Sequence, residues 1–208
     1  MRDDHFQPEP IRGLPQALPP GEKILWQGAP NWWGLARDAL LIRWIIGYFG
    51  LLAIWRAVIR MGETGWIGAA QHTLPLILAG VIAVGLMAAI AWSQARATVY
   101  TITNRRLVMR IGVALTLAIN LPFSRVGAVD LQVRRDGTGT IALRLTGGKV
   151  PGYLACWPHV RPWRMAQVQP ALRSIPDAAG VATLLSKALR AELSVDQTMD
   201  ALPAVAAE

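Results

Sequence analysis

The residues best suited to recognition are concentrated between Cys156 and Arg164, a segment that reads Cys-Trp-Pro-His-Val-Arg-Pro-Trp-Arg. Tryptophan and arginine are favoured at binding hot spots, and prolines reduce the entropy lost when a segment becomes ordered on binding. The segment therefore predicts a docking surface for a protein or a membrane, formed by Trp157, His159, Arg161, Trp163 and Arg164. An equally good interpretation is a loop whose tryptophans complete a hydrophobic core.

Other side chains that could carry catalysis are scattered along the chain. The three histidines and Cys156 lack the spacing of metal ligands, and none lies beside a carboxylate in a catalytic arrangement. His159 could in principle ligate a magnesium tetrapyrrole, but a lone loop histidine more often only forms hydrogen bonds. Gly137 and Gly139 fit a loose dinucleotide fingerprint, yet they join two predicted strands, which a turn explains. We expect no enzymatic activity, catalytic residue, cofactor or metal.

The positive charge of the chain is unevenly distributed. The formal net charge is +8, and from Arg96 to Arg173 twelve Lys and Arg residues face only two acidic residues. Beside a membrane helix, anionic lipid is the first partner to consider, at about 1 kcal/mol per cation near the surface. Arg105, Arg106 and Arg110 are the candidate headgroup ligands, and we expect no nucleic acid partner. A solvated basic face would give the same pattern.

The composition, 53% hydrophobic and 16% charged, is too apolar for an ordinary soluble chain of 208 residues. Residues 73–92 contain no charge, and at about 1.5 Å per residue they cover the roughly 30 Å of hydrocarbon in a bilayer. We predict a transmembrane helix over about 73–95. Two small-xxx-small pairs would allow close helix packing or self-association: Ala79 with Ala83, and Gly85 with Ala89.

An earlier apolar segment, 40–59, is interrupted by Arg43 and Arg56, and its charge-free centre is short for a bilayer. It spans if both arginines extend toward the headgroups, with Trp44 and Trp55 as interfacial anchors. We predict a helix over about 38–60 that completes a two-helix hairpin. The alternative is a helix lying on the membrane surface.

The arginines also predict the orientation. The connection 60–72 carries one arginine, whereas the flank after Trp92 carries Arg96 and the three candidate headgroup ligands. By the positive-inside rule the connection lies outside and both termini are cytoplasmic, in a multi-pass protein. Residues 1–10 lack the apolar core of a cleavable signal peptide.

Beyond the hairpin the apolar period becomes alternating. Residues 129–133 and 141–145 alternate on either side of Asp136-Gly137-Thr138-Gly139, which predicts a β-hairpin. Further strands are predicted at 98–103, 105–110 and 115–121. A helix over 178–193, capped by Asp177, has the apolar face needed to cover this five-stranded sheet.

Several motifs resemble known families. The segment Leu18-Pro19-Pro20-Gly21-Glu22-Lys23-Ile24-Leu25-Trp26, the hairpin, and Tyr100-Thr101-Ile102-Thr103-Asn104-Arg105-Arg106 resemble the membrane-anchored bacterial pleckstrin-homology (PH)-like family. Asn120-Leu121-Pro122-Phe123, the 136–139 turn, the 157–163 loop and Ala171-Leu172-Arg173-Ser174-Ile175-Pro176-Asp177 are similar to the PuhB family of photosynthetic complex assembly proteins of purple bacteria.

The expected fold class is an α+β membrane protein: a two-helix transmembrane hairpin plus a small antiparallel β PH-like domain capped by a C-terminal helix. Residues 1–37 form a Pro-rich arm with a short strand at 22–28, and 38–95 form the hairpin. Residues 96–194 form the cytoplasmic PH-like domain, which contains the 156–164 loop, and 195–208 form a disordered tail.

The second resemblance implies a non-enzymatic assembly factor of the photosynthetic membrane, whose partners are reaction-centre and core light-harvesting subunits. The alternative from the residues is a PH-like module that binds anionic membrane lipids and organises the membrane. A membrane enzyme or pigment carrier is a third interpretation, which would need a bound tetrapyrrole.

Overall fold

The computed structural model describes residues 11–147 and 152–200, with side chains up to residue 194. The predicted N-terminal arm and C-terminal tail therefore lie partly outside the described residues. The chain forms two compact units. Residues 32–95 form one, called here the hairpin unit, and the described residues on either side of it form the other, called here the β domain.

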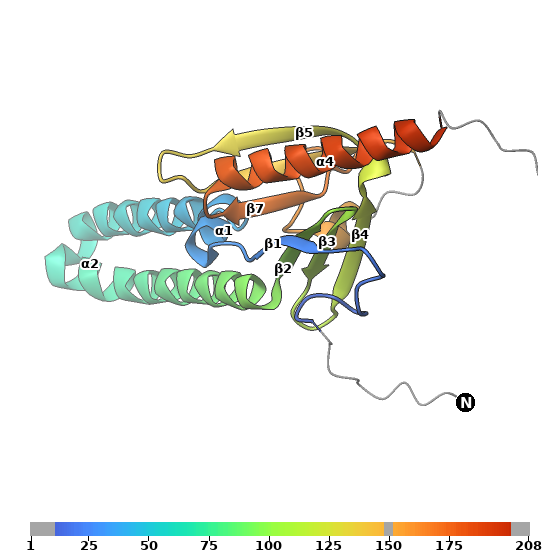
Figure 1. The fold of residues 1–208 in the computed structure, drawn as a ribbon. Coiled ribbons are helices and arrows are strands. Elements are labelled where there is room, and N and C mark those ends of the chain that lie inside the picture. Colours follow the sequence, from blue (N-terminus) through green and yellow to red (C-terminus); the bar gives the residue numbers. More distant parts are fainter. Residues whose placement is uncertain (1–10, 148–151, 201–208) are drawn as a thin grey trace, which may run out of the picture. The chain divides into compact units, whose positions relative to one another are not determined.

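In the described part of the β domain, seven antiparallel strands form two sheets (Figure 1). The order of the first sheet is β1-β2-β3-β4 and that of the second is β5-β6-β7. The first contains β1 (Ile24–Gly28), β2 (Val99–Thr103), β3 (Arg106–Ile111) and β4 (Leu117–Pro122). The second contains β5 (Val126–Val133), β6 (Gly139–Leu145) and β7 (Ala171–Ile175), and a short 3-10 helix, η1 (Phe123–Arg125), joins the sheets.

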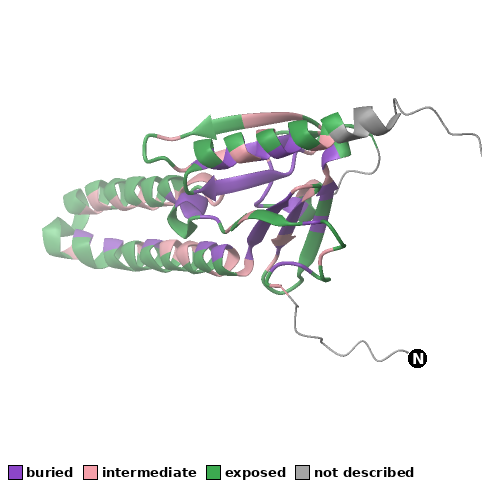
Figure 2. Cartoon of the chain, in the orientation of Figure 1, coloured by how far each residue is buried: buried purple, intermediate pink, exposed green. Residues whose placement is uncertain are grey.

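Both sheets and helix α4 (Ala178–Asp200) contribute to one hydrophobic core. Val181, Leu185 and Leu189 of α4 are buried against it, which is the face that the sequence predicts. Asp177 Oδ1 accepts a hydrogen bond from the backbone N–H of Gly180 at 3.2 Å and caps the helix. All residues of β2 and β7 are buried, and both strands carry that colour in Figure 2.

The predicted β-hairpin is formed by β5 and β6, with Leu131 opposite Ile141. Asp136 Oδ1 accepts hydrogen bonds from the backbone N–H and the hydroxyl of Thr138, at 3.0 and 2.6 Å. Gly137 has a φ of 76°, which favours glycine at this point of the turn.

The hairpin unit contains a short helix, α1 (Trp32–Asp38), and a long one, α2 (Ile42–Ala97). At Gly65 the backbone leaves the helical region, with φ 67° and ψ −177°, a conformation essentially restricted to glycine. The chain reverses there, so α2 has two arms that run side by side in opposite directions (Figure 1). Phe49 of the first arm lies against Gly80 of the second. A Cβ added to Gly80 would lie 2.9 Å from the Cβ of Phe49, so the contact leaves no room for a larger residue.

Three parts of this architecture differ from the predictions. The connection between the two arms is not a loop over 61–72, because the helix continues to Gly65 and resumes directly after it. Strand β7 was not predicted, and the strands divide into two sheets instead of one. The capping helix extends to Asp200, seven residues beyond its predicted end at 193.

Candidate docking surface

The segment that follows the short helix α3 (Tyr153–Cys156) is fixed to the second sheet at both of its ends. The backbone N–H of Ala171 donates to the His159 carbonyl at 3.0 Å, and that of Arg161 donates to the Gln169 carbonyl at 2.9 Å. Val160 forms an isolated β-bridge with Pro170. Residues 162–168 therefore project as a loop from a base that the backbone holds firmly.

His159 lies at this base with no solvent exposure. Its Nδ1 is 2.6 Å from the Tyr100 hydroxyl and its Nε2 is 3.0 Å from the Thr98 hydroxyl. The Tyr100 oxygen accepts from the backbone N–H of Arg173 at 3.2 Å, so we assign its proton to the bond toward Nδ1. A neutral imidazole that donates from Nε2 to Thr98 completes the network.

The surroundings of this network favour neutral groups. Burial and, secondarily, the nearby charge of Arg173 lower the pKa of His159 from 6.5 to about 3. Burial raises the pKa of Tyr100 well above its usual value. His159 is thus a core residue that anchors the loop, which corrects its prediction as part of an exposed docking surface and as a tetrapyrrole ligand.

Both tryptophans of the segment, by contrast, reach the surface. Trp163 is 86% exposed and Trp157 is 43% exposed. Leu154 and Met165 are also largely exposed, and Arg164 lies beside them on the chain. We call these five residues the tryptophan surface. At 86% exposure Trp163 does not complete the core, whereas more than half of the Trp157 side chain is covered.

Arg161 connects the loop to the outer face of the second sheet. Its Nη1 lies 2.5 Å from Asp130 Oδ2 of β5 and 3.1 Å from the Gln169 side-chain oxygen. Asp130 also contacts Arg144 Nη2 of β6 at 3.4 Å. Arg161 thus positions the loop instead of presenting a free cation. The sequence contains no local signal for this pairing, because Asp130 precedes Arg161 by 31 residues.

Beside this pair the same face holds a cavity of about 360 Å³. Arg134, Arg161 and Arg173 line it together with Asp130. Arg173 is buried and donates to the backbone carbonyls of Pro158 and Val160, at 3.5 and 3.4 Å. The three arginines make this part of the domain positively charged next to the tryptophan surface.

The three arginines predicted to bind headgroups do not form one site. Arg106 forms a two-pronged ion pair with Glu22, from Nε to Oε1 at 2.7 Å and from Nη2 to Oε2 at 2.8 Å. Arg110 is partly buried on β3, and Arg105 is exposed. Of the three, Arg105 alone is exposed, and its binding of lipid headgroups stays a prediction.

The Glu22–Arg106 pair is one of several contacts between the two motifs that resemble PH-like proteins, residues 18–26 and 100–106. Asn104 Oδ1 accepts from the Lys23 N–H at 2.8 Å, and its Nδ2 donates to the Gly21 carbonyl at 3.1 Å. Burial raises the pKa of Glu22, but the hydrogen bonds and charge of Arg106 and the hydroxyl of Thr103 outweigh it, so the pKa is lowered overall. These motifs hold the arm before β1 against the β2–β3 turn.

The small residues singled out on the second arm lie off the contact between the arms. Ala79, Gly85 and Ala89 are exposed, Ala83 is partly buried, and a Cβ on Gly85 would meet nothing within 4 Å. The arms instead meet at Gly80, and Ala91 packs near Ile42 and Ala36. Ala79 lines a cleft between the arms, so of the two predicted pairs it is Gly85 with Ala89 that is available to another helix.

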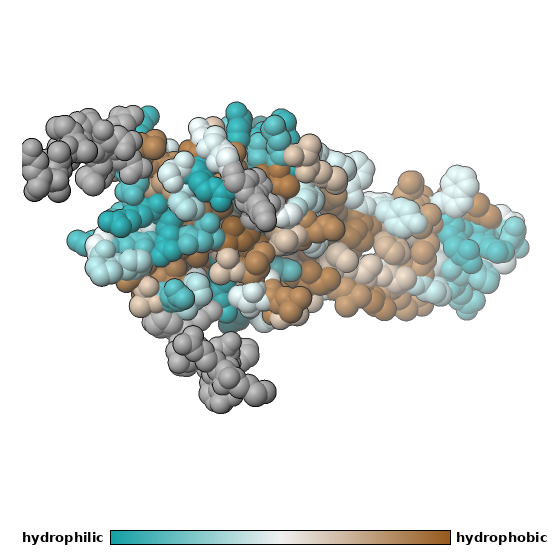
Figure 3. All heavy atoms as spheres, turned by 90° about the vertical axis from the view of Figure 1, so that its right-hand side faces the viewer, coloured by the Kyte–Doolittle hydropathy of each residue, from teal (hydrophilic) through white to brown (hydrophobic). Residues whose placement is uncertain are grey.

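Large apolar side chains cover the outside of the hairpin unit. Trp44 is 77% exposed, and Leu51, Ile54, Val81 and Ile82 each expose more than half of their surface. Figure 2 shows both arms mainly in the colour of exposed residues, and Figure 3 shows hydrophobic and hydrophilic residues gathered in separate regions of one face. By length and composition, α2 is the one helix among the described residues that could cross a membrane.

A β domain of two antiparallel sheets with a capping helix, joined to a long apolar helix, defines the class of this protein. Residues 39–189 match the Bacterial PH domain family, and the chain belongs to this family. It is similar to an uncharacterized 23.7 kDa protein in the puhA 5′ region of Rhodobacter capsulatus, with 42% identity over 100% of this chain and 98% of that protein.

A more distant likeness exists to a crystal structure of a DUF1696 family protein with a pleckstrin-homology domain from Shewanella loihica PV-4. The identity is 13% and the TM-score is 0.29, over 43% of this chain and 69% of that one. Among the residues that the structure describes, no group of three or more His, Cys, Asp or Glu side chains could hold a metal ion.

Proposed function

We propose that this chain is a non-enzymatic assembly factor of the bacterial photosynthetic membrane. Its hairpin unit spans the inner membrane with both arms, its termini are cytoplasmic, and its clients are subunits of the reaction centre and the core light-harvesting complex. The observation that carries the proposal is the exposure of large apolar side chains around both arms of α2. Such a surface is stable in lipid or against another membrane helix.

The tryptophan surface supports a second contact with the client, outside the bilayer. Trp163 and Leu154 are each 86% exposed, and a β domain that already has a buried core gains nothing from them as a monomer. Aromatic side chains beside arginine are the composition of binding hot spots. The firm backbone base at residues 159–161 lowers the entropy lost on binding.

The relative from Rhodobacter capsulatus supports the setting of the proposal. Its name places it in the 5′ region of puhA, and its identity of 42% extends over the whole chain. Together with the motifs that resemble PuhB proteins, this gene neighbourhood agrees with a role in assembling photosynthetic complexes.

The proposal is tested with a C-terminally tagged chain in photosynthetically grown cells. Membranes are solubilised gently and the co-purifying proteins are identified by mass spectrometry. We expect reaction-centre or core light-harvesting subunits with the wild type and a loss on the order of tenfold with Trp163→Ala, since a hot-spot tryptophan contributes about 2 kcal/mol or more. Trp66→Ala is the matched control, because Trp66 is 74% exposed but belongs to the hairpin unit.

Recovery of lipid and unrelated membrane proteins alone would contradict the proposal. That outcome would favour the alternative, a PH-like module that binds anionic lipid through Arg105. Equal losses with Trp163→Ala and Trp66→Ala would show that the tryptophan surface is not the client contact.

A further inference from the structure

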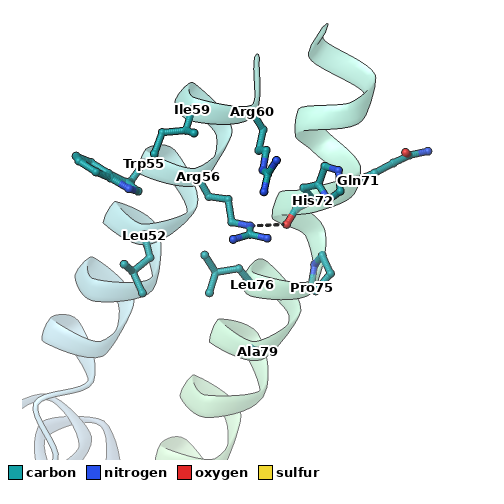
Figure 4. A pocket seen from close by; sticks show the side chains of 10 residues that line it. All are labelled: Leu52, Trp55, Arg56, Ile59, Arg60, Gln71, His72, Pro75, Leu76 and Ala79. Carbon is teal, nitrogen blue, oxygen red and sulfur yellow. Dashed lines mark hydrogen bonds between the residues drawn. The ribbon is translucent and has the colours of Figure 1, made fainter. Parts of the chain in front are cut away.

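The two arms of α2 enclose a cleft of about 780 Å³ close to the chain reversal at Gly65 (Figure 4). Its walls are polar at one end and apolar at the other. Arg56, Arg60 and His72 lie at the end nearer the reversal, and Leu52, Leu76 and Ala79 lie further along the arms. No described residue that lines the cleft is acidic.

Arg56 is held inside this cleft by the backbone of the opposite arm. Its Nε donates to the His72 carbonyl at 3.2 Å, and Figure 4 shows the guanidinium between the arms. Pro75 has no amide hydrogen, so the helical bond from residue 75 to the Gln71 carbonyl is missing in this turn. Arg56 donates to the next carbonyl along the chain, that of His72, and not to the Gln71 carbonyl that Pro75 leaves without its helical donor.

Arg60 lies one helical turn further along the same arm. Its Nη1 pairs with Oε2 of the exposed Glu63 at 2.6 Å, and Glu63 does not line the cleft. The Arg60 side chain reaches toward the second arm in Figure 4. Two guanidinium groups with one nearby carboxylate leave the polar end of the cleft with a net positive charge.

The register of the arms sets the depth of this polar end. Phe49 lies opposite Gly80 and Arg56 lies opposite His72, so Arg56 is level with the beginning of the charge-free run 73–92. If this run spans the hydrocarbon, as the proposed function requires, the guanidinium groups are at headgroup depth and the apolar end faces the acyl chains.

We propose that the cleft binds one anionic phospholipid, with its phosphate at Arg56 and Arg60 and an acyl chain along Leu52 and Leu76. Guanidinium groups form two-pronged, charge-assisted hydrogen bonds with phosphate. Two of them favour a headgroup of net negative charge over a zwitterionic one. The apolar half of the cleft selects a lipid over free phosphate, which would leave that half without contacts.

The test uses the full chain in nanodiscs that contain phosphatidylglycerol and phosphatidylcholine. The lipids retained after transfer to detergent are counted by native mass spectrometry. We expect the wild type to retain one phosphatidylglycerol, and Arg56→Gln to lower its retention on the order of tenfold. Arg43→Gln is the matched control, because it removes the same charge from the other end of the same arm. Leu76→Trp, which fills the apolar end without changing the charge, should also release the lipid.

Equal retention of phosphatidylglycerol by Arg56→Gln and Arg43→Gln would overturn the inference, as would equal retention of both lipids by the wild type. Release of the bound lipid by added inorganic phosphate would identify a simple phosphate site instead. Membrane fractionation of the wild type separates this inference from the proposed function. A chain absent from membranes defeats both, whereas an inserted chain without a retained lipid defeats only the inference.

Discussion

In the β domain large apolar side chains lie inside, whereas in the hairpin unit they lie outside. Tyr100, Leu143 and Leu172 have no exposed surface, but Trp44, Ile54 and Val81 are each mostly exposed. The first arrangement is stable in water because burial removes apolar surface from solvent. The second is stable only where the surroundings are themselves apolar. This difference between the two units is what the proposed insertion of the hairpin unit into the membrane predicts.

The comparison is tested first by truncating a leucine in each region. We expect Leu143→Ala to destabilise the β domain by about 2–5 kcal/mol, because the substitution leaves a cavity in a packed core. Leu86→Ala in the hairpin unit removes a side chain that is mostly exposed, so its effect should stay within about 0.5 kcal/mol. Denaturant unfolding of the detergent-solubilised protein measures both, and similar losses would remove the contrast.

A charge placed in each region gives the next largest effect. Ile82 is exposed near the middle of the charge-free run, and Ile82→Lys should raise the free energy of membrane insertion by about 2.5–3.5 kcal/mol. Val133→Lys, at an exposed position of β5, is the control and should change nothing measurable. The fraction that resists alkaline extraction from membranes reports insertion. Full resistance of the Ile82→Lys variant would contradict a spanning arm.

An ion pair in each region gives a smaller expected difference in unfolding free energy. Glu22→Gln removes the charge from a buried carboxylate that holds Arg106, and we expect a loss of about 1–3 kcal/mol in unfolding free energy. Glu63→Gln weakens the exposed pair with Arg60 and should cost less than about 1 kcal/mol. Because the pKa of Glu22 is lowered below its ordinary 4.5, its contribution is present at neutral pH and is lost as the pH falls below that value.

The last predicted effect is a pH dependence from the buried histidine. The pKa of His159 falls from 6.5 to about 3 on folding, so between these values the unfolded chain binds one more proton than the folded chain. Stability should therefore decrease on acidification through this range, by about 1.4 kcal/mol per pH unit from this group. His159→Gln should reduce the slope by one proton. An unchanged slope with His159→Gln would show that the imidazole is not held neutral.

The sequence predicted correctly the elements that depend on contacts between residues close together in the chain. The turn at Asp136–Gly139 and the cap at Asp177 each depend on contacts within three residues, and both are present. Strand β7 escaped prediction because Pro170 and Pro176 flank it and because all five of its residues are buried, so no alternation marks it. The reversal at Gly65 escaped because one glycine replaces the expected loop.

The candidate site was predicted less completely because its contacts are distant in sequence. Trp157 and Trp163 were identified as candidate recognition residues, and both reach the surface, but their binding of a partner stays a prediction. His159 and Arg106 have the residue types of binding groups, yet partners 59 and 84 residues away use them for structure. Leu154 and Met165 were not singled out in the sequence, because nothing in their residue types shows that these apolar side chains are exposed.

The most direct test of an assembly factor held in the membrane is deletion of its gene, followed by measurement of reaction-centre and core light-harvesting absorption in photosynthetically grown membranes. We predict that both complexes decrease and that the wild-type gene restores them, whereas the Ile82→Lys variant does not. Normal levels of both complexes in the deletion strain would contradict the account.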